Sequence, residues 1–264
     1  MARPIIALLT DFGSRDHYAG VMKGVILGIV PDITLVDVLH DLPAHDVPFA
    51  ARELEASYRY FPAGTIFLVV VDPGVGTARR GLAAEVGDWK FVAPDNGVLS
   101  GVFENSPPKR VVELTERRYA RPTVSRTFEG RDRFAPAAAW LAKGIQLPAL
   151  GRAVTDYCML ELPRAVLEGD TLSGQVVRID RFGNVVTNLD RANCERLTEG
   201  EGAVQLAVGG QPIARIVSTY GDLQAGEVGA LFGSTDHLEC AAPETSAAKQ
   251  LGVKVGDPAV LTRV

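Results

Sequence analysis

Short apolar runs alternate with amphipathic segments over the first 150 residues, and this alternation constrains the fold more than any other feature of the sequence. Apolar runs typical of buried strands lie at 4–12, 33–42, 65–74, 90–97 and 110–116. Segments with the spacing of amphipathic helices lie at 16–31, 47–62 and 131–144. Such alternation favours an α/β sandwich built around a mostly parallel sheet.

The sequence changes character after about residue 165. Short β-type runs separated by glycine and asparagine turns replace the alternation, and the Gly209-Gly210 pair is typical of a hairpin. We therefore predict two domains, an N-terminal α/β domain over residues 1–160 and a smaller, all-β, barrel-like domain over residues 168–264. The segment 160–170 would connect them.

Composition argues against several classes of protein. A net charge of −5 disfavours a nucleic-acid partner, because phosphate binding needs a basic surface. No apolar run approaches the roughly 20 residues that span a bilayer, and we interpret the apolar N-terminal run as a first strand rather than a signal peptide. The three cysteines are far apart and form no CxxC pair, which disfavours disulfides and a zinc site. We therefore expect a cytoplasmic protein without a membrane segment.

Acidic residues follow three of the predicted strands, at Asp11, Asp41 and Asp72. Any one of them taken alone could simply cap the turn or helix that follows. Ligands of open α/β sheets, however, bind beyond the carboxyl ends of the strands. Three acids at one edge of the sheet therefore indicate a functional site there.

The stretch VVVDPGVGTARRGL, residues 69–82, joins a strand end to a glycine-rich turn and two arginines. It lacks the Lys-Ser/Thr pair of a phosphate-binding P-loop and the glycine spacing of a dinucleotide site. A second interpretation fits better, in which Arg79 folds back across the turn, keeps Asp72 ionised and helps it to bind and polarise a water. The alternative is an ion pair that only stabilises the turn.

Five ordered motifs carry a resemblance to a known family: LLTDFGSRDHYAGVMKGVI, VDPGVGTARRGL, APDNGVLS, TFEGRDRFAPAAAWLA and IDRFGNVVTN. Together they resemble the S-adenosyl-L-methionine (SAM) hydroxide adenosyltransferases, which are SAM hydrolases related to the fluorinase and chlorinase. The resemblance implies a homotrimer that binds SAM between domains of neighbouring subunits. It also implies that water attacks C5′ of the ribose, giving adenosine and methionine, with SAM as substrate and with no cofactor or metal.

The resemblance assigns roles to four residues of the N-terminal half. Asp11 matches the aspartate that holds the ribose hydroxyls, a task suited to an acceptor-only carboxylate. Asp72 and Arg79 match two of three residues that hold the attacking water. Glu129, in TFEGRD, stands where the hydrolases typically have a histidine as the third. Matching positions on the rim of the site are occupied by Asp16 and His45.

In the C-terminal half, the resemblance implies substrate contacts at Asp180, Phe182, Asn184 and Ser234. The first three belong to the IDRFGN segment, which contacts the methionine and adenine ends of SAM. Asn184 could instead be a turn residue and Phe182 a core aromatic. Beside Ser234, the sequence departs from the halogenase pattern at Thr235 and Asp236.

The glutamate at position 129 has two expected consequences. Close carboxylates raise the pKa of one of them, so an acidic pair instead of a histidine should shape the pH–rate profile. Asp72 and Glu129 would also repel a halide in a low-dielectric pocket, and Gly130 stands where the fluorinase has a halide-contacting serine. Hydrolysis is therefore favoured over halogenation.

Two alternatives of other classes remain open. A divalent-metal phosphohydrolase could use an acidic rim of Asp11, Asp41, Asp72 and Asp95, although the sequence has no HxH or DxD spacing. A catalytically weak SAM or adenosine sensor would keep Asp11 and the IDRFGN segment but would tolerate loss of Asp72. Binding without turnover would identify the sensor.

Overall fold

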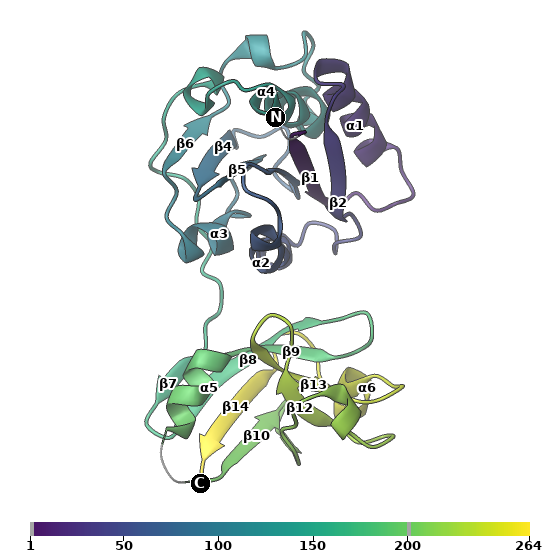
Figure 1. The fold of residues 1–264 in the computed structure, drawn as a ribbon, viewed down its shortest axis with the longest axis vertical. Coiled ribbons are helices and arrows are strands. Elements are labelled where there is room, and N and C mark those ends of the chain that lie inside the picture. Colours follow the sequence, from purple (N-terminus) through teal and green to yellow (C-terminus); the bar gives the residue numbers. More distant parts are fainter. Residues whose placement is uncertain (1–2, 200–201) are drawn as a thin grey trace. The chain divides into compact units, whose positions relative to one another are not determined.

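The computed structural model describes residues 3–199 and 202–264. The chain divides into two compact units, Met1–Leu162 and Pro163–Val264 (Figure 1). Within the described residues, no helix has both the length and the apolar character needed to cross a membrane.

A six-stranded sheet forms the centre of the N-terminal unit, in the order β2-β1-β3-β5-β4-β6. Its strands are β1 (Ile5–Thr10), β2 (Thr34–Leu39), β3 (Ile66–Val70), β4 (Gly81–Val86), β5 (Trp89–Pro94) and β6 (Arg110–Glu113). β1, β2, β3 and β5 pair in parallel, whereas β4 is antiparallel to both of its neighbours. The predicted, mostly parallel α/β sandwich is therefore confirmed. β4 was not predicted from the sequence, because its glycine and alanines are weak strand formers.

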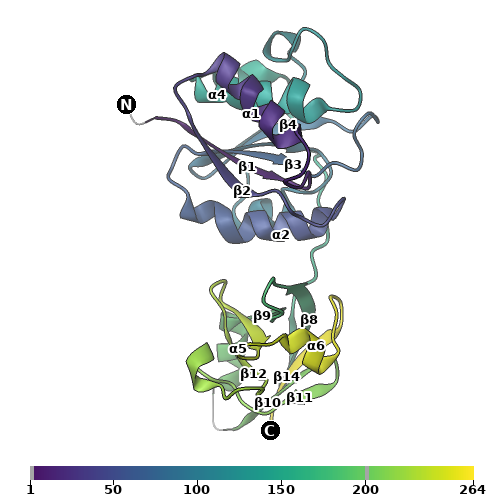
Figure 2. The ribbon, with the colours of Figure 1, turned by 90° about the vertical axis from the view of Figure 1, so that its right-hand side faces the viewer.

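Helices cover both faces of this sheet. α1 (Tyr18–Ile29) and α4 (Ala135–Ala142) lie on one face, and α2 (Val47–Ser57) lies on the other (Figure 2). α3 (Ser100–Asn105) packs on the same face as α2. Successive residues of a strand point to opposite faces, so Ile6 packs with the first helix pair and Ala7 with the second. Burial on both faces explains why the parallel strands are continuous apolar runs. α3 was not predicted.

Shorter helical turns complete the N-terminal unit. A π-helical turn, Gly130–Phe134, runs directly into α4. The 3₁₀ turns lie at Tyr58–Tyr60, Arg117–Tyr119 and Leu147–Leu150. π-helical turns are rare and occur frequently at functional sites, so Gly130–Phe134 and the glutamate that precedes it are of interest.

The C-terminal unit is an antiparallel, barrel-like sheet in the order β11-β10-β14-β8-β9-β13-β12, with β7 paired to β8. Its strands are β7 (Val166–Glu168), β8 (Thr171–Ile179), β9 (Val185–Asp190), β10 (Val204–Val208), β11 (Gln211–Ile213), β12 (Gly229–Phe232), β13 (His237–Ala241) and β14 (Pro258–Arg263). The predicted barrel-like fold is confirmed. It also contains two short helices that were not predicted, α5 (Arg191–Thr198) and α6 (Ala247–Leu251), and a 3₁₀ turn at Tyr220–Asp222.

The predicted hairpin at Gly209-Gly210 is confirmed. Val208 of β10 pairs with Gln211 of β11, so the two glycines alone form the connection. Both have positive φ, 59° and 77°. A two-residue turn with this backbone matches the twist of the flanking strands. It favours glycine, which adopts positive φ without a steric penalty because it has no Cβ.

Candidate active site

The carboxyl ends of β1 and β3 place two of the predicted acids together. β1 and β3 are parallel neighbours in register from Ile6–Ile66 to Thr10–Val70; Asp11 directly follows β1, and Asp72 follows β3 after Val71. Both line a cavity of about 290 Å³. Glu129, which directly precedes the π-helical turn, lines the same cavity. The rest of the wall includes Phe12, Tyr18, His45 and Phe128.

The other strand-end acids do not line this cavity. Asp41 is exposed near Gly13, at the same edge of the sheet but outside the cavity wall. Asp95 has both carboxylate oxygens engaged, one by Arg80 and one by the backbone N–H of Cys158. Across residues 3–199 and 202–264, no three His, Cys, Asp or Glu side chains cluster as metal ligands would. The acidic rim of the phosphohydrolase alternative is therefore not assembled.

Arg79 joins the two cavity carboxylates. Its Nη2 atom donates to Asp72 Oδ2 and to Glu129 Oε2, both at 2.6 Å. The side chains of Asp72 and Arg79 are each 6% exposed, and that of Glu129 is 14% exposed. Arg79 contacts both carboxylates but does not itself form part of the cavity wall. The structure thus brings the three predicted catalytic residues into one buried ion-pair network.

The turn between Asp72 and Arg79 explains how the chain folds back. The Thr77 hydroxyl donates to the Gly74 carbonyl and accepts from the Arg79 N–H, which closes the turn. Gly76 has a φ of +80°, and a Cβ there would lie 2.6 Å from the carbonyl oxygen of Arg126. Glycine is therefore required at position 76, both for the backbone conformation and for contact with the segment that leads to Glu129.

Two atoms of this network lack a hydrogen-bond partner within the described part of the chain. They are Asp72 Oδ1 and Arg79 Nε, and both are buried. Burial raises the pKa of Asp72; Arg79 lowers it, and the charge on Glu129 raises it again, so that it ends above its ordinary value. Buried polar atoms are rarely left unpaired. Asp72 therefore lies on the cavity wall as a buried carboxylate whose pKa is raised, although the backbone N–H of Gly74 also lowers that pKa.

The raised pKa of Asp72 predicts a trade-off between activity and stability. A carboxyl group whose pKa is higher in the folded than in the unfolded protein favours folding below its unfolded pKa, and this contribution is lost as pH rises through the folded pKa. We expect Asp72→Asn to remove this penalty and to melt above the unsubstituted protein at pH 7, by about 2–4 °C per kcal/mol gained. Calorimetry at pH 7 and pH 4 checks this, because the gain should shrink at pH 4. A lower melting temperature at pH 7 contradicts it.

Asp11 also lines the cavity, and its side chain is 8% exposed. Its Oδ2 accepts a hydrogen bond of 2.9 Å from the backbone N–H of His45, whose ring is exposed and lines the cavity. The structure therefore brings Asp11 and His45 together. Asp16 is exposed and lies outside the cavity wall.

A hydrogen-bonded chain that the sequence analysis missed supports the segment bearing Asp11. The buried Thr10 hydroxyl lies 2.8 Å from His40 Nδ1, and His40 Nε2 lies 2.9 Å from Asp37 Oδ1. Burial raises the pKa of Asp37, but hydrogen bonds from Lys23 and His40 outweigh it and leave the pKa below its usual value. The backbone carbonyl of His40 also accepts from the Gly13 N–H. His40 therefore fixes the chain on both sides of Asp11.

In the C-terminal unit, three predicted contacts share the turn between β8 and β9. Asp180 Oδ1 accepts from the backbone N–H groups of Phe182 and Asn184, and its Oδ2 accepts from the Asn184 side chain. Asn184 is thus part of the turn, as one alternative proposed. The Phe182 side chain is 78% exposed, so the alternative of a core aromatic is wrong.

The fourth predicted contact, Ser234, lies apart from that turn. It is exposed in the turn before β13, where His237 pairs with Asp190 at the far end of β9. The Asp180 turn precedes Val185, at the near end of β9. The two ends are five residue steps apart along β9, ~17 Å, so the two turns lie at opposite ends of this strand.

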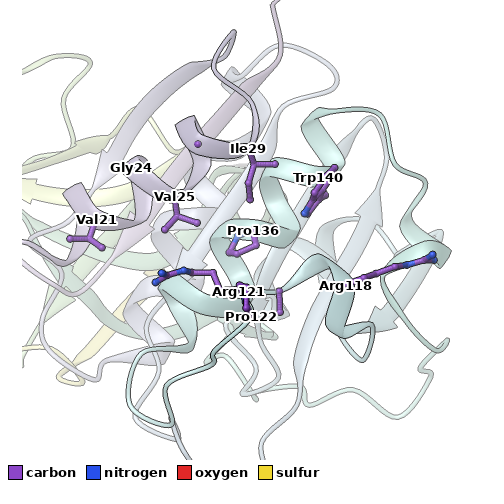
Figure 3. A pocket seen from close by; sticks show the side chains of 11 residues that line it. Val21, Gly24, Val25, Ile29, Arg118, Arg121, Pro122, Pro136 and Trp140 are labelled. Carbon is purple, nitrogen blue, oxygen red and sulfur yellow. The ribbon is translucent and has the colours of Figure 1, made fainter.

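The N-terminal unit has a second, larger cavity. It has a volume of about 590 Å³ and lies along α1 and α4, with Val25, Ile29 and Trp140 on its walls (Figure 3). Its charged residues are Arg118 and Arg121, and no carboxylate lines it. Without an acid or base, this cavity does not offer the groups that proton transfer or water activation requires.

Models of known protein families match both halves of the chain. Residues 6–151 match the SAM hydroxide adenosyltransferase N-terminal domain, and residues 174–260 match the C-terminal domain. This chain belongs to the SAM hydroxide adenosyltransferase family. The resemblance inferred from the five motifs is therefore confirmed.

Relatives in this family are similar over almost the whole chain. An (R)-S-adenosyl-L-methionine hydrolase of Thermus thermophilus is 40% identical, over 97% of this chain and 98% of that protein. One of Salinispora tropica is 38% identical over 96% of each. A fluorinase of Nocardia brasiliensis is 31% identical over 96% of this chain and 95% of that protein. The crystal structure of an uncharacterized conserved protein from Thermotoga maritima superposes with a TM-score of 0.92 at 36% identity, covering 98% of this chain and all of the other.

Proposed function

We propose that this protein hydrolyses SAM to adenosine and L-methionine, by attack of a bound water on C5′ of the ribose. The observation that carries the proposal is the Asp72 carboxylate of raised pKa on the cavity wall, joined through Arg79 to Glu129 on the same wall. Similarity to proteins named SAM hydrolases over nearly the whole chain supports the choice of substrate.

The reaction requires the protein to align the water with C5′ of SAM and to provide a proton acceptor. The water oxygen forms a bond to C5′ while the C5′–S bond breaks, and the bonding pair leaves with sulfur as the neutral thioether of methionine. The water proton passes to Asp72, whose raised pKa makes it a stronger base than an ordinary aspartate. Arg79 orients Asp72 and Glu129 toward the cavity. Orientation supplies up to about 7–11 kcal/mol, and no cofactor or metal takes part.

Asp11 is proposed to hold the ribose. An ionised carboxylate only accepts hydrogen bonds, which suits the two donors of the 2′ and 3′ hydroxyls. The backbone contact from His45 fixes one of its oxygens, so the carboxylate is oriented before substrate arrives. Preorganisation of this kind places C5′ against the water that Asp72 binds.

The same cavity disfavours a halide as the nucleophile. Asp72 and Glu129 line this cavity, whereas the two arginines that pair with them do not, so a halide would meet the carboxylates first, and like charges repel strongly where water is excluded. A Cβ at Gly130 would already approach Met22 Sδ and a Val70 methyl group to 3.3 Å. A serine that donates to a halide would therefore be crowded at this position.

We also propose that the protein is a cytoplasmic homotrimer whose active sites lie at subunit interfaces. The cavity of about 290 Å³ is at the low end of the usual range for ligand pockets, so further walls are needed to enclose SAM. Phe182, exposed in the turn that Asp180 and Asn184 shape, offers an aromatic surface for the adenine, and Ser234 a hydroxyl for the far end of the ligand. Three free cysteines are consistent with a reducing compartment.

Product analysis tests the proposed function. The purified protein is incubated with SAM in chloride-free buffer, then with added fluoride or chloride, and the products are separated by chromatography. We expect adenosine and methionine in equal amounts, unaffected by halide or by a chelator. A halogenated nucleoside would show halide transfer instead, loss of activity in chelator would support metal-dependent chemistry, and bound but intact SAM would identify a sensor.

His40→Gln is expected to weaken ribose binding without removing catalysis. Loss of the Thr10 and Asp37 contacts leaves the Asp11 segment less well fixed, which we expect to raise the KM for SAM about tenfold, the equivalent of one hydrogen bond. Inhibition by adenosine should weaken to the same extent, whereas inhibition by 2′,3′-dideoxyadenosine should not change. Asp32→Asn, in an exposed pair with Arg3, is the control. Equal weakening of both nucleosides would refute a role through the ribose.

A further inference from the structure

We propose that Arg133 is a positioning residue that makes a glutamate effective at position 129. It neutralises Glu129 and fixes its carboxylate, so that the charge of Arg79 remains available to Asp72. The inference rests on the proposed function, because it concerns the same reaction. Arg133 was not among the site residues indicated by the sequence.

Each oxygen of Glu129 contacts a different arginine. Oε2 accepts from Arg79 at 2.6 Å, and Oε1 accepts from Arg133 Nη1 at 2.9 Å. The second guanidinium nitrogen of Arg133 donates to the carbonyl of Leu114 at 2.6 Å. That carbonyl follows β6, and the Leu114 N–H is bound to Gly81 at the start of β4. Arg133 is therefore held by the sheet, and Glu129 is held between two fixed cations.

The local backbone makes this contact possible. Glu129 directly precedes the π-helical turn Gly130–Phe134, and Arg133 lies four residues later within it. Side chains four residues apart in a helix are neighbours on one face. The Arg133 side chain is 23% exposed and does not line the cavity. It can therefore act on the reaction only through Glu129.

The charges of the network balance because Arg133 is present. Asp72 and Glu129 carry two negative charges, and Arg79 and Arg133 carry two positive charges. This balance matters because the positive charge of the SAM sulfonium disappears as the C5′–S bond breaks. An uncompensated negative charge nearby would stabilise the charged substrate more than the transition state and would slow the reaction.

Removal of Arg133 should therefore separate binding from catalysis. With Glu129 no longer neutralised, the site attracts the SAM cation more strongly, so KM should stay the same or fall. We expect kcat to fall about tenfold, because the substrate is stabilised and Glu129 is no longer fixed. The extra negative charge also raises the pKa of Asp72 further, so the acidic limb of the pH–rate profile should move to higher pH.

The experiment compares Arg133→Met and Arg133→Lys with the unsubstituted protein, measuring kcat, KM and the pH–rate profile by adenosine release. Arg3→Met is the matched control, because it removes an arginine from an ion pair with Asp32 that is exposed on both sides. Arg133→Lys keeps the charge but replaces the two nitrogens that contact Glu129 and Leu114 with one, and we expect it to restore part of kcat and the original acidic limb.

A double-mutant cycle with Glu129→Gln tests whether Arg133 acts through Glu129. If it does, Arg133→Met should have little further effect on kcat in the Glu129→Gln protein. The proposal is overturned if Arg133→Met leaves kcat and the pH profile unchanged, if KM rises instead, or if the two losses simply multiply. Circular dichroism shows whether Arg133→Met folds. If it does not fold, the test rests on Arg133→Lys. A shift of the acidic limb of the pH–rate profile in Arg133→Lys would then overturn the proposal. Failure of the proposed function is distinct, because the unsubstituted protein would then release no adenosine.

Discussion

Asp72→Asn is expected to lower kcat for SAM hydrolysis by about 10²–10⁴-fold, the usual contribution of a general base. Asparagine keeps the shape of the side chain but cannot take a proton from water. Because Asp72 lines the cavity while Arg79 remains paired with Glu129, we expect KM to change little. Single-turnover measurement of adenosine release checks this.

Asp41→Asn is the matched control for that substitution. Asp41 follows a neighbouring strand at the same edge of the sheet, but it is exposed and does not line the cavity. We expect its kcat to remain within twofold of the unsubstituted value. An Asp72→Asn protein that is folded and fully active would exclude Asp72 as the base and would leave Glu129 as the acceptor.

Arg79→Met is expected to have the largest effect on stability. It leaves Asp72 and Glu129 buried together without the cation between them, and loss of one partner of a buried ion pair typically destabilises a protein by 3–5 kcal/mol. The pKa of Asp72 is already raised by burial, although Arg79 opposes this rise. Without Arg79 the pKa rises further, so the unfavourable charge is present at neutral pH and is removed by protonation as pH falls.

Urea unfolding of Arg79→Met at pH 7 and pH 5 measures this effect. We expect the deficit in unfolding free energy to be smaller at pH 5, because protonation relieves the repulsion between the carboxylates. Arg3→Met again serves as the control, because its ion pair with Asp32 is exposed on both sides and should contribute only about 0–1 kcal/mol. A deficit that is the same at both pH values would mean that lost packing against Phe134, whose ring lies 5.3 Å from the guanidinium carbon, dominates the effect.

Several features of the site could be predicted because they depend on local sequence. Apolar runs followed by aspartate placed Asp11 and Asp72 at the ends of parallel strands, and parallel strands carry their carboxyl ends to one edge. The contact between Asp72 and Arg79 spans only seven residues and a glycine-rich turn, so its geometry is limited by the turn itself. The ordered motifs added Glu129 through family resemblance.

Other features could not be predicted from local patterns. β4 and α3 have weak signals of their own and form because the sheet and its helices pack around them. Asp41 has the same pattern as Asp11 and Asp72, yet it lies outside the cavity wall because the chain leaves β2 with this residue exposed. Ser234 is separated from the Asp180 turn by the register of β9 and β13.

The sequence by itself determined the fold class, the strand ends that bear acids, and the turn that returns Arg79 to Asp72. Each follows from side-chain periodicity or from backbone conformations that a few neighbouring residues control. Only the tertiary structure decided that Glu129, fifty residues beyond Arg79, meets the same guanidinium, and that Arg133 occupies its other oxygen. These contacts depend on how the π-helical turn and α4 pack against the sheet, and distances between segments remote in sequence are set by that packing.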